Sequence, residues 1–142
     1  MNVDGVNNGI VLDHIHAGKS MEIYRILRLD KLTCSVAVIQ NVTSEKYGKK
    51  DIIKIDEDID INLDVLGYID PNITVNRVRD GKLSRKEHLE LPEMVTDIIK
   101  CKNPRCITSI EQELDQVFLL TDEENEIYRC RYCEEKYHGK LK

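Results

Sequence analysis

Four cysteines in two close pairs constrain this chain more than any other feature of its sequence. Cys101 and Cys106 form a Cys-x₄-Cys pair, and Cys130 and Cys133 form a Cys-x₂-Cys pair farther along. A short turn between two thiols lets both reach one ion, and two such turns complete the tetrahedral shell that Zn²⁺ prefers. The spacing therefore predicts one structural zinc with four cysteine ligands and no open position for catalysis.

Basic side chains beside the cysteines support this interpretation. Four thiolates around Zn²⁺ leave two net negative charges, which the flanking residues would offset: Lys100, Lys102, Arg105, Arg129 and Arg131. Residues 94–142, which hold the four cysteines, are also too few to build a core alone. Domains of this size commonly need a metal or a disulfide to stabilise them. Two disulfides or buried unligated thiols are the alternatives, and paired spacing in an intracellular chain favours the metal.

Two other side chains, His138 and Cys34, are weaker candidates for metal ligands. His138 follows Cys133 closely enough to compete for the metal, but the four thiols already complete the shell. Cys34 lies in a strand-like pattern, so we expect a small buried apolar side chain there.

The composition excludes several functions. The net charge is −5, with 33% charged residues, which disfavours sequence-independent binding of nucleic acid because that binding neutralises phosphates. A local lysine cluster can still hold one phosphorylated ligand. No apolar run is long enough to span a bilayer, and the first residues lack the basic region and cleavage site of a signal peptide. We therefore expect a cytoplasmic protein that does not bind membranes.

Periodicity before the cysteines predicts an α+β fold. Strands and helices alternate in the order β-α-β-β-α-β with one further strand: 9–15, 19–29, 32–42, 50–56, 61–69, 73–79 and 82–91. Asp80-Gly81 between the last two runs is a hairpin signal. This order predicts a ferredoxin-like antiparallel sheet with two helices, followed by a small β-rich zinc-binding domain. Leu91-Pro92-Glu93 is a natural joint, so the predicted domains are 1–92 and 93–142.

The first predicted helix, 19–29, has an amphipathic pattern. Its apolar residues can share one broad face: Met21, Tyr24, Ile26, Leu27 and Leu29. Glu22 and Arg25 are expected mostly on the other face.

Lysines on the third predicted strand are candidate ligand contacts. Alternation puts Lys50 and Lys54 on one face, roughly 13 Å apart, a spacing that can bracket a nucleotide. A solvated sheet face is the alternative. The neighbouring Asp13-His14 pair fits a structural hydrogen bond better than a catalytic dyad, and the sequence contains no P-loop or dinucleotide fingerprint.

Several segments, in this order, resemble one family. They are GIVLDHI, GKKDIIKI, TVNRV, LPE and the two cysteine pairs, and together they look like the regulatory chain of aspartate carbamoyltransferase. The resemblance covers nearly the whole chain. It implies a non-catalytic subunit in pyrimidine biosynthesis, whose N-terminal allosteric domain binds CTP and UTP as inhibitors and ATP as activator. It also implies a zinc domain that contacts the catalytic chain, with regulatory dimers bridging catalytic trimers into a dodecamer.

The resemblance also implies particular nucleotide contacts. Asp13 would take a ribose hydroxyl, and His14 would lie near the phosphates. The remaining positions that match the family's site are Val3, Asp4 and Val6 at the base edge, Lys50 and Lys54 near the base and ribose, Asn76 and Val78 lining the pocket, and Lys86 at the phosphates, with Arg85 as its rival. The N-terminus is shorter than in the best-studied relatives, which leaves the direction of each effector open.

Two other functions remain as alternatives. The cysteine spacing alone also permits a zinc-ribbon module that binds another protein or a nucleic acid. An enzyme that uses Asp13, His14 and a lysine is disfavoured, because the sequence offers no coherent nucleophile and no open metal site.

Overall fold

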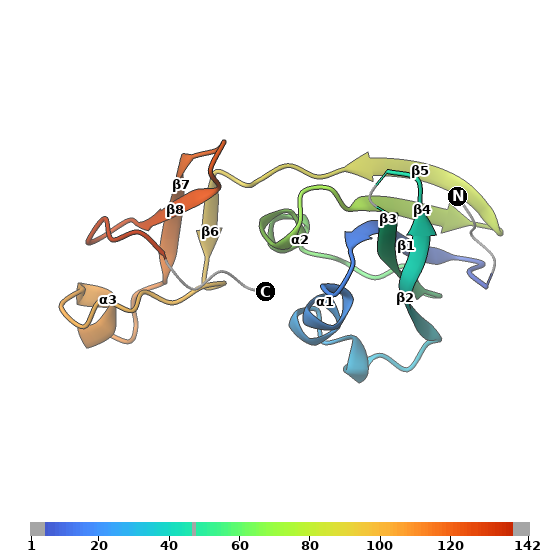
Figure 1. Cartoon of the computed structure of the whole chain (residues 1–142). Coiled ribbons are helices and arrows are strands. Elements are labelled where there is room, and N and C mark those ends of the chain that lie inside the picture. Colours follow the sequence, from blue (N-terminus) through green and yellow to red (C-terminus); the bar gives the residue numbers. More distant parts are fainter. Residues whose placement is uncertain (1–4, 47, 138–142) are drawn as a thin grey trace. The chain divides into compact units, whose positions relative to one another are not determined.

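The structure of the chain is a computed structural model that describes residues 5–46 and 48–137. The chain divides into two compact units, one ending at Glu90 and the other beginning at Leu91. Figure 1 shows both units, and each is described separately here.

The first unit is an antiparallel sheet with helices on one side. Its elements are β1 (Gly9–His16), α1 (Ser20–Ile26), a 3₁₀ helix η1 (Leu29–Lys31), β2 (Val36–Ser44), β3 (Gly48–Ile55), α2 (Leu63–Ile69), β4 (Thr74–Arg79) and β5 (Lys82–His88). The five strands lie in the order β2-β3-β1-β4-β5. Figure 1 shows α1 and α2 on the same side of this sheet. The predicted ferredoxin-like fold is therefore confirmed, and β5 extends it at one edge.

Aliphatic side chains fill the layer between the sheet and the helices. Leu12 of β1 pairs with Ile53 of β3 and Val75 of β4, so these three side chains share one face, and none of them is exposed. Ile23 of α1 and Leu66 of α2 are also fully buried. Since cross-strand partners point the same way, this row identifies the helix-covered face of the sheet.

A buried carboxylate fixes the start of α1. Asp51, on the helix-covered face of β3, accepts hydrogen bonds from the Ser20 hydroxyl at 2.6 Å and from the backbone N–H groups of Gly18, Ser20 and Asn41. Burial alone would raise the pKa of this carboxyl, but the hydrogen bonds from Ser20, Asn41 and Gly18 lower it overall. Asp51 therefore remains ionised inside the unit and joins β3, α1 and β2.

The predicted apolar face of the first helix is wrong in part, although Leu29, in η1, is buried as predicted. Met21 and Ile26 are 39% and 36% exposed, whereas Glu22 is only 8% exposed. The bonds to Asp51 turn Ser20 toward the sheet, and Ile23 lies one turn later on the same face. In a helix of seven residues, that anchor determines which side is buried.

Cys34 also differs from the prediction. It lies before β2, which begins at Val36, and its side chain is half-buried rather than buried. β2 is an edge strand of the sheet, and the residues leading into it gain little cover.

The second unit is small and rich in β-structure, as predicted. Its elements are β6 (Met94–Thr96), α3 (Ile107–Ile110), β7 (Val117–Asp122) and β8 (Ile127–Cys130), with strand order β6-β7-β8. Phe118 is buried and meets the ring of Tyr137 edge to face, with centroids 5.6 Å apart. Among the described residues, no helix is long and apolar enough to cross a membrane.

Candidate functional site

The four predicted metal ligands converge in the second unit. Cys101 and Cys106 lie in the segment between β6 and α3, Cys130 is the last residue of β8, and Cys133 follows in a turn. Their four Sγ atoms all lie within 4.8 Å of one another. The Sγ atoms of Cys101 and Cys133 are 3.7 Å apart, and those of Cys106 and Cys130 are also 3.7 Å apart.

These distances fit a metal and not a disulfide. A tetrahedral zinc with Zn–S bonds of about 2.3 Å requires sulfur atoms about 3.8 Å apart. A disulfide requires about 2.05 Å. The set of donors therefore fits one structural Zn²⁺, and the prediction of the four ligands is confirmed by geometry. His138 lies outside the described residues.

The thiols need a cation in order to ionise together. Burial raises the pKa of Cys101 to about 12 and also raises that of Cys130. Burial acts in the same direction on Cys106, but a hydrogen bond with Thr108 and the neighbouring thiols lower its pKa to about 7. One thiolate therefore forms easily while its neighbours resist. A divalent metal supplies the missing positive charge and displaces the remaining protons.

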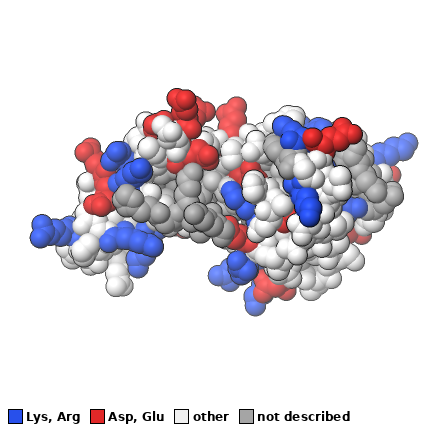
Figure 2. Space-filling view, viewed as in Figure 1, with Lys and Arg blue, Asp and Glu red and all other residues white. Residues whose placement is uncertain are grey.

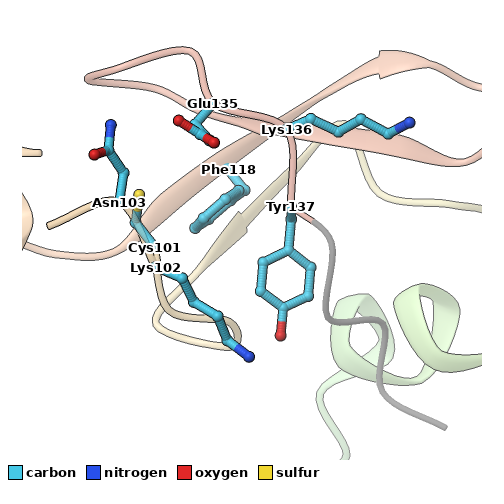
Figure 3. A pocket seen from close by; sticks show the side chains of 7 residues that line it. All are labelled: Cys101, Lys102, Asn103, Phe118, Glu135, Lys136 and Tyr137. Atoms are coloured by element: carbon cyan, nitrogen blue, oxygen red, sulfur yellow. The ribbon is translucent and has the colours of Figure 1, made fainter.

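Hydrogen bonds to the backbone of the cysteines hold the metal-binding segments in place. The Cys101 backbone N–H donates to the Gln116 side-chain oxygen at 2.9 Å, and the Cys130 N–H donates to the Glu135 carbonyl at 2.9 Å. Figure 3 shows the adjoining cavity, about 90 Å³ in volume, with Phe118 and Tyr137 among its lining residues. A cavity of this size is smaller than ordinary ligand pockets, and the four thiols leave no open position on the metal, as in a structural site.

The other predicted nucleotide contacts that the structure describes, apart from the rival Arg85, lie on the helix-free face of the first unit. Val11 of β1 pairs with Lys54 of β3 and Asn76 of β4, and Asn76 pairs with Lys86 of β5. These side chains form one row across four strands, which spans about 14 Å at roughly 4.8 Å per strand. Alternation along β3 puts Lys50 on the same face as Lys54, as predicted, because Asp51, Ile53 and Ile55 between and beyond them are buried. The face is large enough for a nucleotide-sized ligand.

Asp13 reaches this face by regular pairing with Thr74, and an irregularity in β1 follows at His14. The pairing of β1 with β3 shifts between Leu12 and Ile15, and His14 has a φ of 60°. Asp13 is 1% exposed and forms an ion pair of 2.9 Å with Lys50. The Nδ1 atom of His14 lies 3.2 Å from the hydroxyl oxygen of Thr74. The predicted Asp-His pair thus takes separate partners on two neighbouring strands.

Burial and nearby lysines shift the pKa values of Asp13 and His14. Burial would raise the pKa of Asp13, but Lys50 and the His14 N–H lower it overall. The pKa of His14 is lowered, first by burial and then by Lys50, Lys86 and Lys46, against an opposing effect of Asp13. At neutral pH His14 is therefore largely uncharged while lysine ammonium groups surround it.

Asn76 carries a buried acceptor without a partner. Its side chain is 0% exposed, and Nδ2 donates to the carbonyls of Val11 at 3.2 Å and Thr74 at 3.4 Å. Within the described residues, Oδ1 accepts no hydrogen bond. An unsatisfied buried acceptor costs about 1–3 kcal/mol, so this atom marks a place where a donor from a ligand would be stabilising.

A small apolar patch adjoins the row. Val6 packs on Val11 and Val78, with Ile52 against them. Val3 and Asp4, predicted to read the base edge, lie outside the described residues. Sequence reasoning missed Val11 and Thr74, and only the register of β1 against β4 reveals that both reach this face.

Lys86 and Arg85 lie on opposite faces of β5. Lys86 pairs with Asn76 and shares its helix-free face, whereas Arg85 pairs with Arg77 on the other side. Arg85 also donates to Glu87 at 2.7 Å and 3.0 Å.

The fold and the two candidate sites define a class: a two-unit protein with a metal-stapled module and an α+β module that offers a basic face for a ligand. Family models match both units, as the allosteric domain of the aspartate carbamoyltransferase regulatory chain over residues 1–90 and its metal-binding domain over residues 93–141. The chain therefore belongs to the family of aspartate carbamoyltransferase regulatory chains, which are not themselves the catalytic subunit.

Curated relatives agree over almost the full length. The chain is 51% identical to the aspartate carbamoyltransferase regulatory chain of Clostridium tetani over 138 residues, covering 96% of both chains. It is 48% identical to that of Clostridium botulinum strain Hall (98% of this chain, 95% of the relative) and 44% identical to that of Bifidobacterium longum (96% and 98%). The resemblance inferred from the sequence is confirmed.

Membership of this family supports the regulatory function over a zinc-ribbon module. On the face drawn in Figure 2, basic and acidic side chains are interspersed over the surface. A surface that binds nucleic acid through its phosphates typically gathers basic residues into a patch or stripe.

Proposed function

We propose that residues 1–92 form the allosteric domain that binds CTP, UTP and ATP, and that residues 93–142 hold the chain against the catalytic chain. In this proposal, regulatory dimers bridge catalytic trimers into a dodecamer in the cytoplasm. The protein converts nucleotide occupancy on one chain into a change of rate on another.

The observation that carries the nucleotide proposal is the row on the helix-free face. The row holds, strand by strand, Lys54, Val11, Asn76 and Lys86. The orphaned Asn76 Oδ1 adds an acceptor that only a further donor would satisfy.

Each end of the proposed site has a distinct role. We assign the phosphates to His14 and Lys86, because the charges of Lys50, Lys86 and Lys46 all act on His14. We assign the ribose to Asp13, which the ion pair with Lys50 holds ionised as an acceptor for a hydroxyl. Lys86, and not Arg85, is the phosphate contact in this proposal, since Arg85 is engaged by Glu87 on the opposite face.

Regulation then requires two states with different nucleotide affinities. A ligand shifts such an equilibrium only by its differential affinity, typically about 1–3 kcal/mol of coupling. The metal-stapled unit is suited to transmit the shift as a rigid body, because the four cysteines cross-link its segments around one point.

Calorimetric titration of the purified chain with CTP and ATP tests this proposal. Lys54→Ala should weaken nucleotide affinity about tenfold through loss of a charge-assisted contact, with unchanged zinc content. Lys49→Ala is the matched control, because Lys49 lies on the same strand and is exposed, but alternation points it to the opposite face. Equal affinities in the native chain and Lys54→Ala would remove this face from the nucleotide site.

A further inference from the structure

A basic pocket lies on the other side of the strands that carry Asn76 and Lys86. Arg77 of β4 and Arg85 of β5 are cross-strand partners on the helix-covered side of the sheet, because Val75, two residues before Arg77, belongs to the core there. A pocket of about 250 Å³ at this edge is lined by Arg77, Arg79, Arg85, Ser84 and Asp58, together with Gly9 and Val78.

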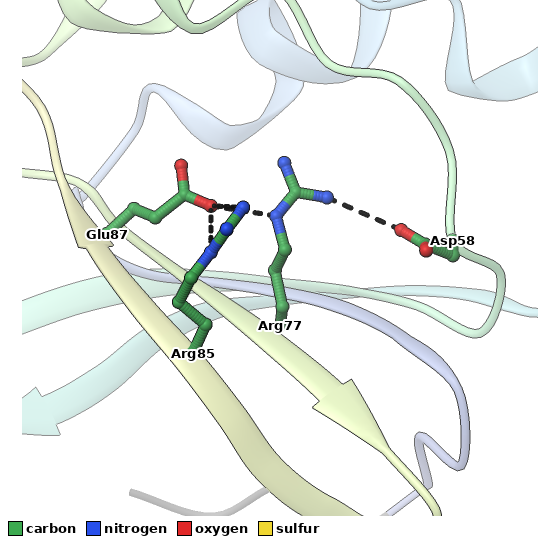
Figure 4. Close-up of polar contacts among 4 residues, drawn as sticks. All are labelled: Asp58, Arg77, Arg85 and Glu87. Atoms are coloured by element: carbon green, nitrogen blue, oxygen red, sulfur yellow. Dashed lines mark hydrogen bonds and ion pairs between the residues drawn. The ribbon is translucent and has the colours of Figure 1, made fainter.

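Two carboxylates hold the guanidinium groups in place without using all of their donors. Glu87 accepts from Arg77 Nε at 2.8 Å and from Arg85 Nη2 at 2.7 Å, and Asp58 accepts from Arg77 Nη1 at 3.3 Å (Figure 4). A guanidinium has five N–H donors, so each of these arginines keeps donors for another acceptor. Hydrogen bonds from Arg77 and then Arg85 lower the pKa of Glu87, so this brace remains ionised.

Arg79 adds a third guanidinium with no internal role. It is exposed, and its side chain makes no ion pair or hydrogen bond with the part of the chain that the structure describes. Three arginines against Asp58 and Glu87 leave one net positive charge at the pocket, in a chain whose net charge is −5. A guanidinium cluster of this kind matches the geometry of phosphate oxygens.

A bulge in the hairpin contributes Ser84. Arg77 pairs with Arg85 and Val78 pairs with Leu83, which leaves Ser84 as the extra residue of β5. Bulges redirect side chains and free backbone groups from the ladder. Ser84 therefore brings a hydroxyl to the pocket, next to Arg85.

We propose that the pocket formed by Arg77, Arg79, Arg85 and Ser84 binds a small phosphate dianion, separately from the nucleotide face. Its guanidinium groups and the Ser84 hydroxyl suit the oxygens of an inorganic phosphate. Because Arg77 lies between Asn76 and Val78 and Arg85 precedes Lys86, the two sites share both strands on opposite faces. We expect occupancy of either site to change the affinity at the other, and such linkage is reciprocal.

Titration of the full chain with inorganic phosphate in a low-chloride buffer, followed by calorimetry, tests the proposal. Saturable binding at one site per chain is expected, with a dissociation constant on the order of 1 mM because the arginines are partly exposed. Arg79→Ala should weaken binding about fivefold to tenfold without unfolding the chain, since this side chain has no internal partner. Arg85→Gln should weaken it similarly, and Lys31→Ala, which removes an exposed positive charge outside the pocket, should leave it unchanged.

Further titrations distinguish phosphate binding in this pocket from binding on the nucleotide face and from nonspecific association. Lys54→Ala should retain phosphate binding, and saturating CTP should change the phosphate affinity without abolishing it. The proposal is overturned if phosphate does not saturate, if Arg79→Ala and Lys31→Ala behave alike, or if CTP and phosphate compete for a single site. Loss of CTP binding in every form of the chain would refute the nucleotide function but leave the phosphate result intact.

Discussion

The metal centre and the helix-free face of the sheet are assembled in different ways. The four thiols come from two short turns of one small unit, and one ion satisfies all of them. The face draws its side chains from four strands, and each contributes through the register of its neighbours. A site of the first kind should fail as a whole when one residue is lost, whereas one of the second kind should weaken in steps.

The largest effect is expected at the metal centre. Cys101→Ser removes one of four ligands, and the zinc binding that stabilises such small domains is worth about 10–16 kcal/mol. The variant should therefore lose its zinc, unfold beyond Leu91 and fail to assemble with the catalytic chain, while nucleotide binding by the first unit survives. Zinc analysis and co-purification with catalytic trimers measure these results.

Cys34→Ser is the matched control, because Cys34 is a half-buried thiol in the other unit. It should keep stoichiometric zinc. A Cys101→Ser chain that still assembles normally would show that the metal is not what makes the second unit competent to dock.

The next largest effect tests the scaffold beneath the basic face. Asp51→Ala removes a buried ionised acceptor and leaves the N–H groups of Gly18 and Asn41 unpaired, which should cost at least about 3 kcal/mol. Denaturant unfolding of the first unit measures this, and Asp60→Ala, an exposed carboxylate, should change the free energy of unfolding by less than about 0.5 kcal/mol.

The same carboxylate gives a pH test with a defined sign. The pKa of Asp51 is lowered in the folded state, so its contribution is complete above the unfolded pKa and is lost as the pH falls through the folded value. Acidification should therefore destabilise the native chain more than Asp51→Ala. Parallel pH profiles for the two chains would contradict this account.

The two regions also differ in how much of them the sequence predicts. The cysteine spacing is local, so the full ligand set follows from it. Alternation in β3 correctly predicts that Lys50 and Lys54 share a face, again because the signal lies within one strand. Val11 and Thr74 reach the same face through pairing between β1 and β4, which no local pattern contains. The buried side of α1 escapes prediction for the same reason, since a contact with the distant Asp51 decides it.

A smaller effect on nucleotide affinity is expected at Asn76, whose unpaired Oδ1 lowers stability but can accept from a ligand. Asn76→Leu removes two hydrogen bonds from Nδ2 but also removes the orphaned Oδ1, so the free energy of unfolding should change by less than about 1 kcal/mol. Nucleotide affinity should fall about tenfold, because the acceptor offered to the ligand is gone. Denaturant unfolding and calorimetry on one preparation separate the two quantities. A variant that loses stability and binding in equal measure would instead make Asn76 a structural residue.

The smallest effect should appear in the pH dependence of nucleotide binding. The pKa of His14 lies below its ordinary value in the free chain, and nearby phosphates would raise it, so binding takes up a proton. Between pH 8 and 6, CTP should therefore bind up to about threefold more tightly to the native chain than to His14→Gln, after the two curves are matched at high pH. The ratio of the two affinities cancels the titration of the nucleotide itself. If it stays constant with pH, His14 does not meet the phosphates, and Lys86 would be left as their contact on that part of the face.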